Sequence, residues 1–193
     1  MLSLDEIRSR FEDAQVDHAE SGERVRAAVA LVLCDEGSGP EVLFIQRAEH
    51  DQDPWSGHLG FPGGRVEATD PDPRAAAERE TREEVDLVLA GAEYLGRLGD
   101  LLGVHLPVVI SCFVFGVRSR PVLTLNPAEV ADAFWFPLEN LLDPRLHGKK
   151  TVRFEGEAVT YPTIQLLAAP RPRLWGITYR LVSRFLEAVG RPL

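Results

Sequence analysis

Apolar and polar residues follow two periods along the chain, and these periods predict a mixture of strands and helices. Short apolar runs rich in β-branched residues are bounded by turn formers, which is typical of buried strands. Other segments repeat their apolar residues every three to four positions, as the buried face of a helix does. We expect strands at residues 25–34, 41–47, 93–98, 105–118 and 131–136, a hairpin at 149–161, and helices at 4–11, 74–85 and 174–189.

The segments between these elements carry turn signals. The polar run DEGSGP at residues 35–40 predicts a tight connection, so we expect the strands on either side of it to pair as a hairpin. Residues 48–60 are rich in turn formers and predict a loop, and residues 99–103 predict a break. Pro137 begins a predicted helical turn, because proline is favoured at the start of a helix.

Strands mixed with few helices indicate an α/β or α+β fold in which a mixed sheet lies between helices. A chain of 193 residues suits a single domain. We expect residues 1–24 to form an N-terminal extension and residues 172–190 to contain a C-terminal helix. The sequence shows no internal repeat, no low-complexity segment and no domain boundary.

The chain is acidic, with 30 Asp and Glu residues against 21 Lys and Arg and a net charge of −9. This balance argues against nucleic acid or an anionic membrane as a partner. It also makes a bound metal useful to any site that holds phosphate. Cys34 and Cys112 lie in apolar runs and are expected to be buried thiols. No segment has the features of a signal peptide or transmembrane length, so we expect a cytoplasmic protein.

The predicted helix at residues 74–85 carries the candidate chemistry. Glu80, Glu83 and Glu84 stand at i, i+3 and i+4, which places three like charges on one face within one turn. Their repulsion destabilises the helix unless a cation lies among them, and Mg²⁺ prefers carboxylate oxygens and bridges to substrate phosphates. The alternative is a solvated face with Glu–Arg pairs.

The apolar side of the same helix is narrow. Ala77, Thr81 and Val85 form one i, i+4 row, and Glu84 lies beside it. Glu84 is therefore expected at the edge of the buried face, where a metal site can be held against the core.

The segment before the helix is a loop of glycine, proline and acidic residues. Pro73 suits the first helical position, and Asp70 or Asp72 could cap the first turn. Gly63 and Gly64 allow a tight turn and a close approach of the backbone to a ligand.

The stretch at residues 63–87 resembles the Nudix box, G-x5-E-x7-R-E-U-x-E-E-x-G-U with U aliphatic. The matching residues are Gly64, Arg79, Glu80, Glu83, Glu84 and Leu87. Asp70 stands where glutamate is usual, and the spacing between the glycine and the arginine is one residue longer. Thr81 replaces an aliphatic residue and Asp86 replaces the glycine.

Further motifs are similar to the coenzyme A pyrophosphatase branch of this family: FPGG at residues 61–64, NPAEV at 126–130 and LWGIT at 174–178. The WSGH run at residues 55–58 is similar only in part. The resemblance implies a Nudix-type α/β/α sandwich and hydrolysis of a diphosphate with Mg²⁺ or Mn²⁺. It also implies a small nucleotide substrate, coenzyme A or an acyl derivative, cleaved to 3′,5′-ADP and 4′-phosphopantetheine.

The resemblance implies a ligand set for the metal. Glu80 and Glu84 are expected to be the principal ligands. Glu83 is expected to be a further ligand, bound directly or through water, and the carbonyl of Gly64 is expected to be an additional one.

The general base is left open between a box glutamate, such as Glu83, and Glu129 in the NPAEV run. A structural role for Glu129 is equally open. Arg79 is expected to orient a carboxylate through a forked hydrogen bond and so to support catalysis.

Arg47, His58 and Gly63 are the expected substrate-binding residues. Arg47 ends a strand, where it binds a phosphate or is simply solvated, and His58 reaches a phosphate or pins its loop. Trp175 is expected on the C-terminal helix, facing either the substrate or the core.

Other functions remain open at this point. The same chemistry suits ADP-ribose, NADH or a dinucleoside polyphosphate. A non-catalytic ligand-binding module is disfavoured because Glu80, Glu83 and Glu84 are all present, and mRNA decapping is disfavoured by the acidic charge. The oligomeric state, a homodimer included, is open.

Overall fold

A computed structural model describes residues 2–12, 17, 19, 22–50, 55–104, 106–154 and 157–193. Its helices are α1 (Leu4–Glu12), α2 (Pro73–Val85) and α3 (Gly176–Ala188), with 3₁₀ turns η1 (Leu89–Gly91), η2 (Leu138–Leu142) and η3 (Pro144–Leu146). Its strands are β1 (Val25–Cys34), β2 (Glu41–Arg47), β3 (Leu59–Gly60), β4 (Gly63–Arg65), β5 (Glu93–Leu102), β6 (Val108–Val117), β7 (Val130–Pro137), β8 (His147–Phe154) and β9 (Glu157–Ile164). Within this described part of the chain, the helices are too short or too polar to cross a membrane.

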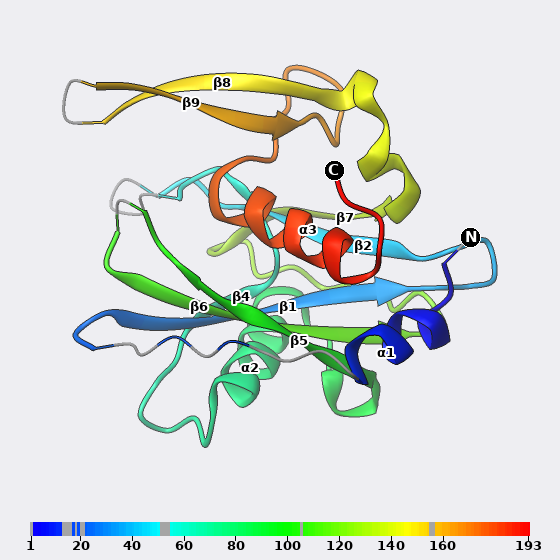
Figure 1. Ribbon diagram of the computed structural model, residues 1–193. Coiled ribbons are helices and arrows are strands. Elements are labelled where there is room, and N and C mark those ends of the chain that lie inside the picture. The colour runs from blue at the N-terminus through cyan, green and yellow to red at the C-terminus, as the bar shows by residue number, and fades with distance from the viewer. Residues whose placement is uncertain are drawn as a thin grey trace.

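The main sheet is mixed and lies between helices (Figure 1). Its strands follow the order β3-β2-β1-β6-β5, with β4 also paired to β1 and β7 to β2. β1 and β6 are parallel along their whole lengths, whereas the other strand pairs are antiparallel. α2 covers one face, and α1 and α3 cover the other (Figure 1). The predicted α/β/α sandwich is therefore confirmed.

The alternating side chains of β1 supply both cores, because successive residues of a strand point to opposite faces. One core holds Ala28, Ala30 and Val32 against the apolar side of α2. The other core holds Leu31 and Leu33 with the apolar sides of α1 and α3. The acidic helix is thereby fixed to the sheet from one side while its outer face stays open.

β8 and β9 form a separate antiparallel hairpin, which lies beyond α3 and away from the main sheet (Figure 1). The predicted hairpin at residues 149–161 is confirmed and is longer at both ends. The expected β1–β2 hairpin is also confirmed, although its register covers only Leu33↔Val42 and Cys34↔Glu41. β7 pairs with the full length of β2 instead.

Two local predictions are wrong. The expected break at residues 99–103 is a continuation of β5, which stays paired to β6 through a register shift between Leu98 and Leu101. Asp100 lies in this irregular stretch and is held by the side chains of Arg97 and Ser111, so pairing survives the glycine. The expected loop at residues 48–60 ends in β3, which pairs with β2, and residues 51–54 of that loop lie outside the described residues.

Candidate metal centre

Local signals fix both ends of α2. Asp72 is the N-cap, and its carboxylate accepts a hydrogen bond of 2.9 Å from the N–H of Ala75. Such a cap stabilises a helix by about 1 kcal/mol. At the other end Asp86 adopts a left-handed conformation with φ of 56°, and its N–H donates to the carbonyl of Arg82. Asp86 thus takes the conformation for which the Nudix box has glycine.

The predicted apolar row of α2 is confirmed, since Ala77, Thr81 and Val85 are completely buried. The hydroxyl of Thr81 donates to the carbonyl of Ala77 at 2.7 Å, which satisfies the polar group that replaces an aliphatic side chain. Glu84 lies beside this row and is only 1% exposed. Because of its place beside the row, Glu84 holds its carboxylate in the protein interior.

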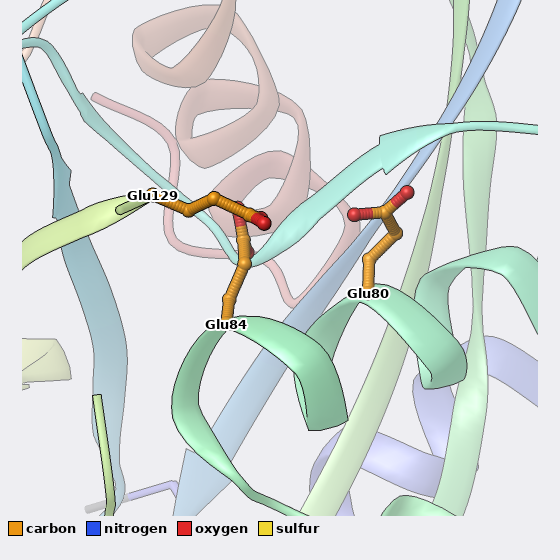
Figure 2. A group of neighbouring side chains, drawn as sticks. All are labelled: Glu80, Glu84 and Glu129. Carbon is orange, nitrogen blue, oxygen red and sulfur yellow. The ribbon is translucent and has the colours of Figure 1, made fainter. Parts of the chain in front are cut away.

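Three carboxylates converge from two elements (Figure 2). Glu80 and Glu84 project from α2, and Glu129 reaches them from the residue before β7. One oxygen from each lies within 4.8 Å of the others. The approach depends on Asn126, whose N–H donates to the carbonyl of Glu84 at 2.9 Å and whose side chain donates to the Glu129 carboxylate at 3.2 Å. The NPAEV run is thereby tied to the end of α2.

Glu84 is a buried carboxylate with few compensating partners among the described residues. It accepts a 2.9 Å hydrogen bond from the N–H of Gly63, and its other oxygen lies 3.8 Å from the guanidinium of Arg47. Burial, together with the charges of Glu80 and Glu129, raises the pKa of Glu84 to about 8 against the opposing effects of Gly63 and Arg47. A positive charge placed among the three carboxylates would remove this penalty.

The two glycines before the acidic loop are required by close packing. Gly63 has φ of +151°, and a Cβ there would lie 2.3 Å from the carbonyl oxygen of Ala28. A Cβ on Gly64 would lie 2.4 Å from the carboxyl carbon of Glu80. β4 can therefore pair with β1 and lie directly against the carboxylates of α2 only without side chains at these positions.

Arg79 connects the acidic loop to α2. Its guanidinium donates to both oxygens of Asp70 at 3.0 Å, and its Nη1 donates to Glu80 and Glu83 at 2.9 Å each. The hydrogen bonds from Arg79 lower the pKa of Asp70. Burial raises the pKa of Glu80, which Arg79 partly counters. Asp70 is thus the arginine's partner rather than the helix cap.

Glu83 lies apart from the three converging carboxylates. Its side chain is 51% exposed and its hydrogen bond goes to Arg79. Among the described residues, the group whose oxygens lie within 4.8 Å of one another is Glu80, Glu84 and Glu129. Glu83 therefore lies at the rim of the site, on the solvent side of Arg79.

The end of β2 places Arg47 and His58 near this site. The N–H of Arg47 donates to the carbonyl of His58 at 3.0 Å, and the N–H of Ala48 donates to the carbonyl of Glu129 at 2.8 Å. His58 and Glu129 therefore flank β2 on opposite sides. The centroid of the His58 ring lies 5.0 Å from that of the Trp175 ring.

Trp175 is placed differently from its prediction. It is the N-cap residue of α3, with φ of −159°, so it lies before the helix and not on its buried side. The signal that could have indicated this is Gly176, which follows it with φ of +65°.

The donor set fits a hard divalent cation. All three converging groups offer carboxylate oxygens, which Mg²⁺ and Mn²⁺ prefer over softer ligands. The buried oxygen atoms of Glu84 are poorly compensated by the described residues, and they lie where a cation can also reach Glu80 and Glu129.

Comparisons with known proteins identify the family and the fold of the chain. The NUDIX domain family matches residues 24–154. An uncharacterized protein of Schizosaccharomyces pombe is 41% identical to this chain. The match covers 55% of this chain and only 35% of that relative's length. A human protein, the mitochondrial coenzyme A diphosphatase NUDT8, is 30% identical over 85% of this chain and 69% of its own. The crystal structure of a MutT/nudix family protein from Enterococcus faecalis has a TM-score of 0.57 at 21% identity, covering 98% of this chain and 70% of that one, and shows the same fold.

Proposed function

The chain belongs to the Nudix hydrolase family, and we propose that it is a metal-dependent diphosphatase that hydrolyses coenzyme A or acyl-coenzyme A. The observation that carries the proposal is the convergence of Glu80, Glu84 and Glu129, with Glu84 buried and poorly compensated among the described residues. A site of this kind concentrates negative charge where a diphosphate has to be bound, and it requires a cation between the two.

In this proposal Glu80 and Glu84 would hold Mg²⁺ or Mn²⁺, with the carbonyl of Gly64 as a further ligand and Glu129 beside the cation. When bound, the cation neutralises phosphate charge and makes a neighbouring water more acidic. The N–H of Gly63 fixes the Glu84 carboxylate by a 2.9 Å hydrogen bond. Arg79 fixes the Glu80 carboxylate while its other nitrogen atoms are held by Asp70.

The proton of the attacking water is proposed to go to Glu129. Glu129 is exposed and comes from a different element than the other two carboxylates, so it can face a water on the substrate side. Glu83 is the alternative base, although its position beside Arg79 at the rim suits a supporting role. Arg47 is proposed to contact a phosphate as well as Glu84, from which its guanidinium is 3.8 Å away.

The choice of substrate rests on similarity. The FPGG, NPAEV and LWGIT runs are similar to the coenzyme A pyrophosphatase branch, and the human relative is a coenzyme A diphosphatase. Other small nucleotide derivatives that contain a diphosphate also suit a cation held by these carboxylates. ADP-ribose, NADH and a dinucleoside polyphosphate are the competing substrates.

The test is product analysis with the purified chain. We would incubate it with Mg²⁺ or Mn²⁺ and coenzyme A, ADP-ribose, NADH or a diadenosine polyphosphate, with Glu84→Gln as the control. Release of 3′,5′-ADP and 4′-phosphopantetheine from coenzyme A, lost in the control, is the expected result. Turnover of another substrate alone would reject the coenzyme A assignment. Recovery of every ligand unaltered would reject the proposal that the chain is a diphosphatase.

A further inference from the structure

Three side chains, those of His58, Tyr161 and Lys150, contact Trp175. Together with Trp175 we call them the Trp175 group. The ring of His58 lies 5.0 Å from the Trp175 ring at an interplanar angle of 67°, and that of Tyr161 lies 5.5 Å away at 62°. The Lys150 ammonium lies over the indole face, 4.5 Å from its centre. The three rings are half-buried and Lys150 is exposed, so the group lies at the surface.

The β8–β9 register determines which side of the hairpin carries this group. Lys150 and Tyr161 are directly paired across the two strands, so their side chains share one face. Lys149 precedes Lys150 and therefore points to the opposite face. Arg173 lies on the inner face, where its Nε donates to the hydroxyl of Thr163 at 2.9 Å. The hairpin is thus held with Lys150 and Tyr161 towards Trp175.

β2 connects the Trp175 group to the carboxylates. The His58 carbonyl accepts from Arg47 on one side of β2, and the Glu129 carbonyl accepts from Ala48 on the other. The backbones of His58 and Glu129 are therefore separated by two interstrand spacings, roughly 10 Å. A nucleotide extends over a similar length from the far edge of its base to its 5′ phosphate. A ligand with its diphosphate at the carboxylates can therefore reach past the end of β2 towards His58, whose ring contacts Trp175.

The chemistry of the group suits an aromatic ligand that also carries an anionic group. Nucleobases stack on aromatic side chains, and an ammonium is a compact charge for phosphate. An exposed cation–π contact contributes less than base stacking does. A base can therefore displace Lys150 from the indole face while the ammonium moves to a phosphate. β8 is a suitable place for an anion, because its sequence HGKKTVRF has no acidic residue in a chain of net charge −9.

We propose that the Trp175 group binds the nucleotide half of the substrate, with Trp175 stacking on the base and Lys150 pairing with a neighbouring phosphate. The inference rests on the proposed function for the identity of the nucleotide. It adds a recognition site, on the β8–β9 hairpin and before α3, to the cation site on α2.

Isothermal titration of the full chain with 3′,5′-ADP and with adenosine, in chelator and without added metal, tests this site directly. We expect 3′,5′-ADP to bind more tightly than adenosine. Trp175→Ala should weaken both ligands by about tenfold, the loss expected when one base loses its stacking partner. Lys150→Ala should weaken 3′,5′-ADP several-fold and leave adenosine unchanged. Trp175→Phe should recover most of the affinity, which separates stacking from a fault in folding.

Lys149→Ala is the matched control, since it removes the same charge from the opposite face of β8 and should bind like the wild type. Absence of 3′,5′-ADP binding by the wild type would overturn the inference. So would unchanged affinities in Trp175→Ala and Lys150→Ala, or equal losses in Lys149→Ala and Lys150→Ala.

The inference and the proposed function fail in different ways. Binding of 3′,5′-ADP that depends on Trp175 and Lys150, without hydrolysis of coenzyme A, would reject the function and support the site. Hydrolysis of coenzyme A with an unchanged KM in Trp175→Ala would support the function and reject the site.

Discussion

Glu84 and Asp100 are two buried carboxylates whose surroundings lead to opposite behaviour. Each side chain is only 2% exposed. Burial raises the pKa of Glu84 to about 8, because the N–H of Gly63 and the more distant Arg47 do not compensate for it. Burial also acts on Asp100, but hydrogen bonds from Ser111, Arg97 and the backbone of Ala19 outweigh it, and the pKa of Asp100 is lowered.

The comparison separates a carboxylate that is part of the framework from one whose partners do not compensate for its burial. Asp100 is satisfied by the chain itself and holds together the irregular stretch of β5. Glu84 lies beside two further carboxylates, Glu80 and Glu129, at a place that a cation can complete. Burial alone therefore does not identify a functional acid, whereas burial with too few donors to offset it indicates one.

The largest expected effect is the loss of activity in Glu84→Gln. Removing a metal ligand should lower kcat by about 10³-fold, or about 4 kcal/mol of transition-state stabilisation. The neutral amide can still accept from the N–H of Gly63, so the fold should be retained. Steady-state hydrolysis and a thermal melt measure the two quantities, and activity within tenfold of the wild type would contradict the assignment.

The pH dependence of stability without metal should follow Glu84. Its folded pKa of about 8 lies above the ordinary value of a glutamate, 4.5. Its favourable contribution is therefore fully present below about pH 4.5 and is lost as pH rises through 8. The free energy of unfolding should fall by roughly 4 kcal/mol over this range in chelator. Denaturant unfolding at several pH values measures it, and Glu84→Gln should show a much smaller decrease.

Asp100 should contribute to stability with the opposite pH dependence, and Asp100→Asn should remove that contribution. It removes a charge partner of the partly buried Arg97 and at least one hydrogen bond, so stability at pH 7 should fall by about 2–3 kcal/mol. Because the folded pKa of Asp100 is lowered, its contribution is present above the unfolded value and is lost as pH falls through the folded one. Denaturant unfolding checks both points. Specific activity of the folded fraction should stay near that of the wild type, and a loss as large as that of Glu84→Gln would remove the distinction between the two acids.

Gly64→Ala should have a smaller effect, confined to the site. The added Cβ would lie 2.4–2.6 Å from the carboxyl atoms of Glu80 and displace them. We expect about a tenfold loss of kcat/KM, since misplacement of one catalytic group by a fraction of an ångström has this order of cost. Gly91→Ala is the control, because nothing lies within 4 Å of a Cβ there. Equal activity of the two variants would show that the position of Glu80 is unimportant.

Features decided by local chemistry were predictable from the sequence. α2 was expected because Pro73 and a capping aspartate before it favour a helix start, and the i, i+4 row placed Glu84 at the buried face. The β8–β9 hairpin and the first and last residues of β1 and β2 were predicted from apolar runs bounded by turn formers.

Features that depend on distant contacts were harder to predict. The approach of Glu129 to α2 requires the hydrogen bond from Asn126 to the carbonyl of Glu84, which no local pattern encodes. β5 continues past Gly99 because Asp100 is held by a side chain of β6, Ser111. The position of Trp175 before α3 depends on a single positive φ at Gly176 and on rings from two other segments.

The central claim is that Glu84 is buried without adequate donors because it is a cation ligand. The most direct test is the change in unfolding free energy on adding Mn²⁺ at pH 7.5, measured for the wild type, Glu84→Gln and Asp100→Asn. A cation that binds the folded state at 100 times its Kd should stabilise the wild type and Asp100→Asn by about 2.7 kcal/mol. Glu84→Gln should gain little or nothing. Equal stabilisation of Glu84→Gln and the wild type would contradict the claim.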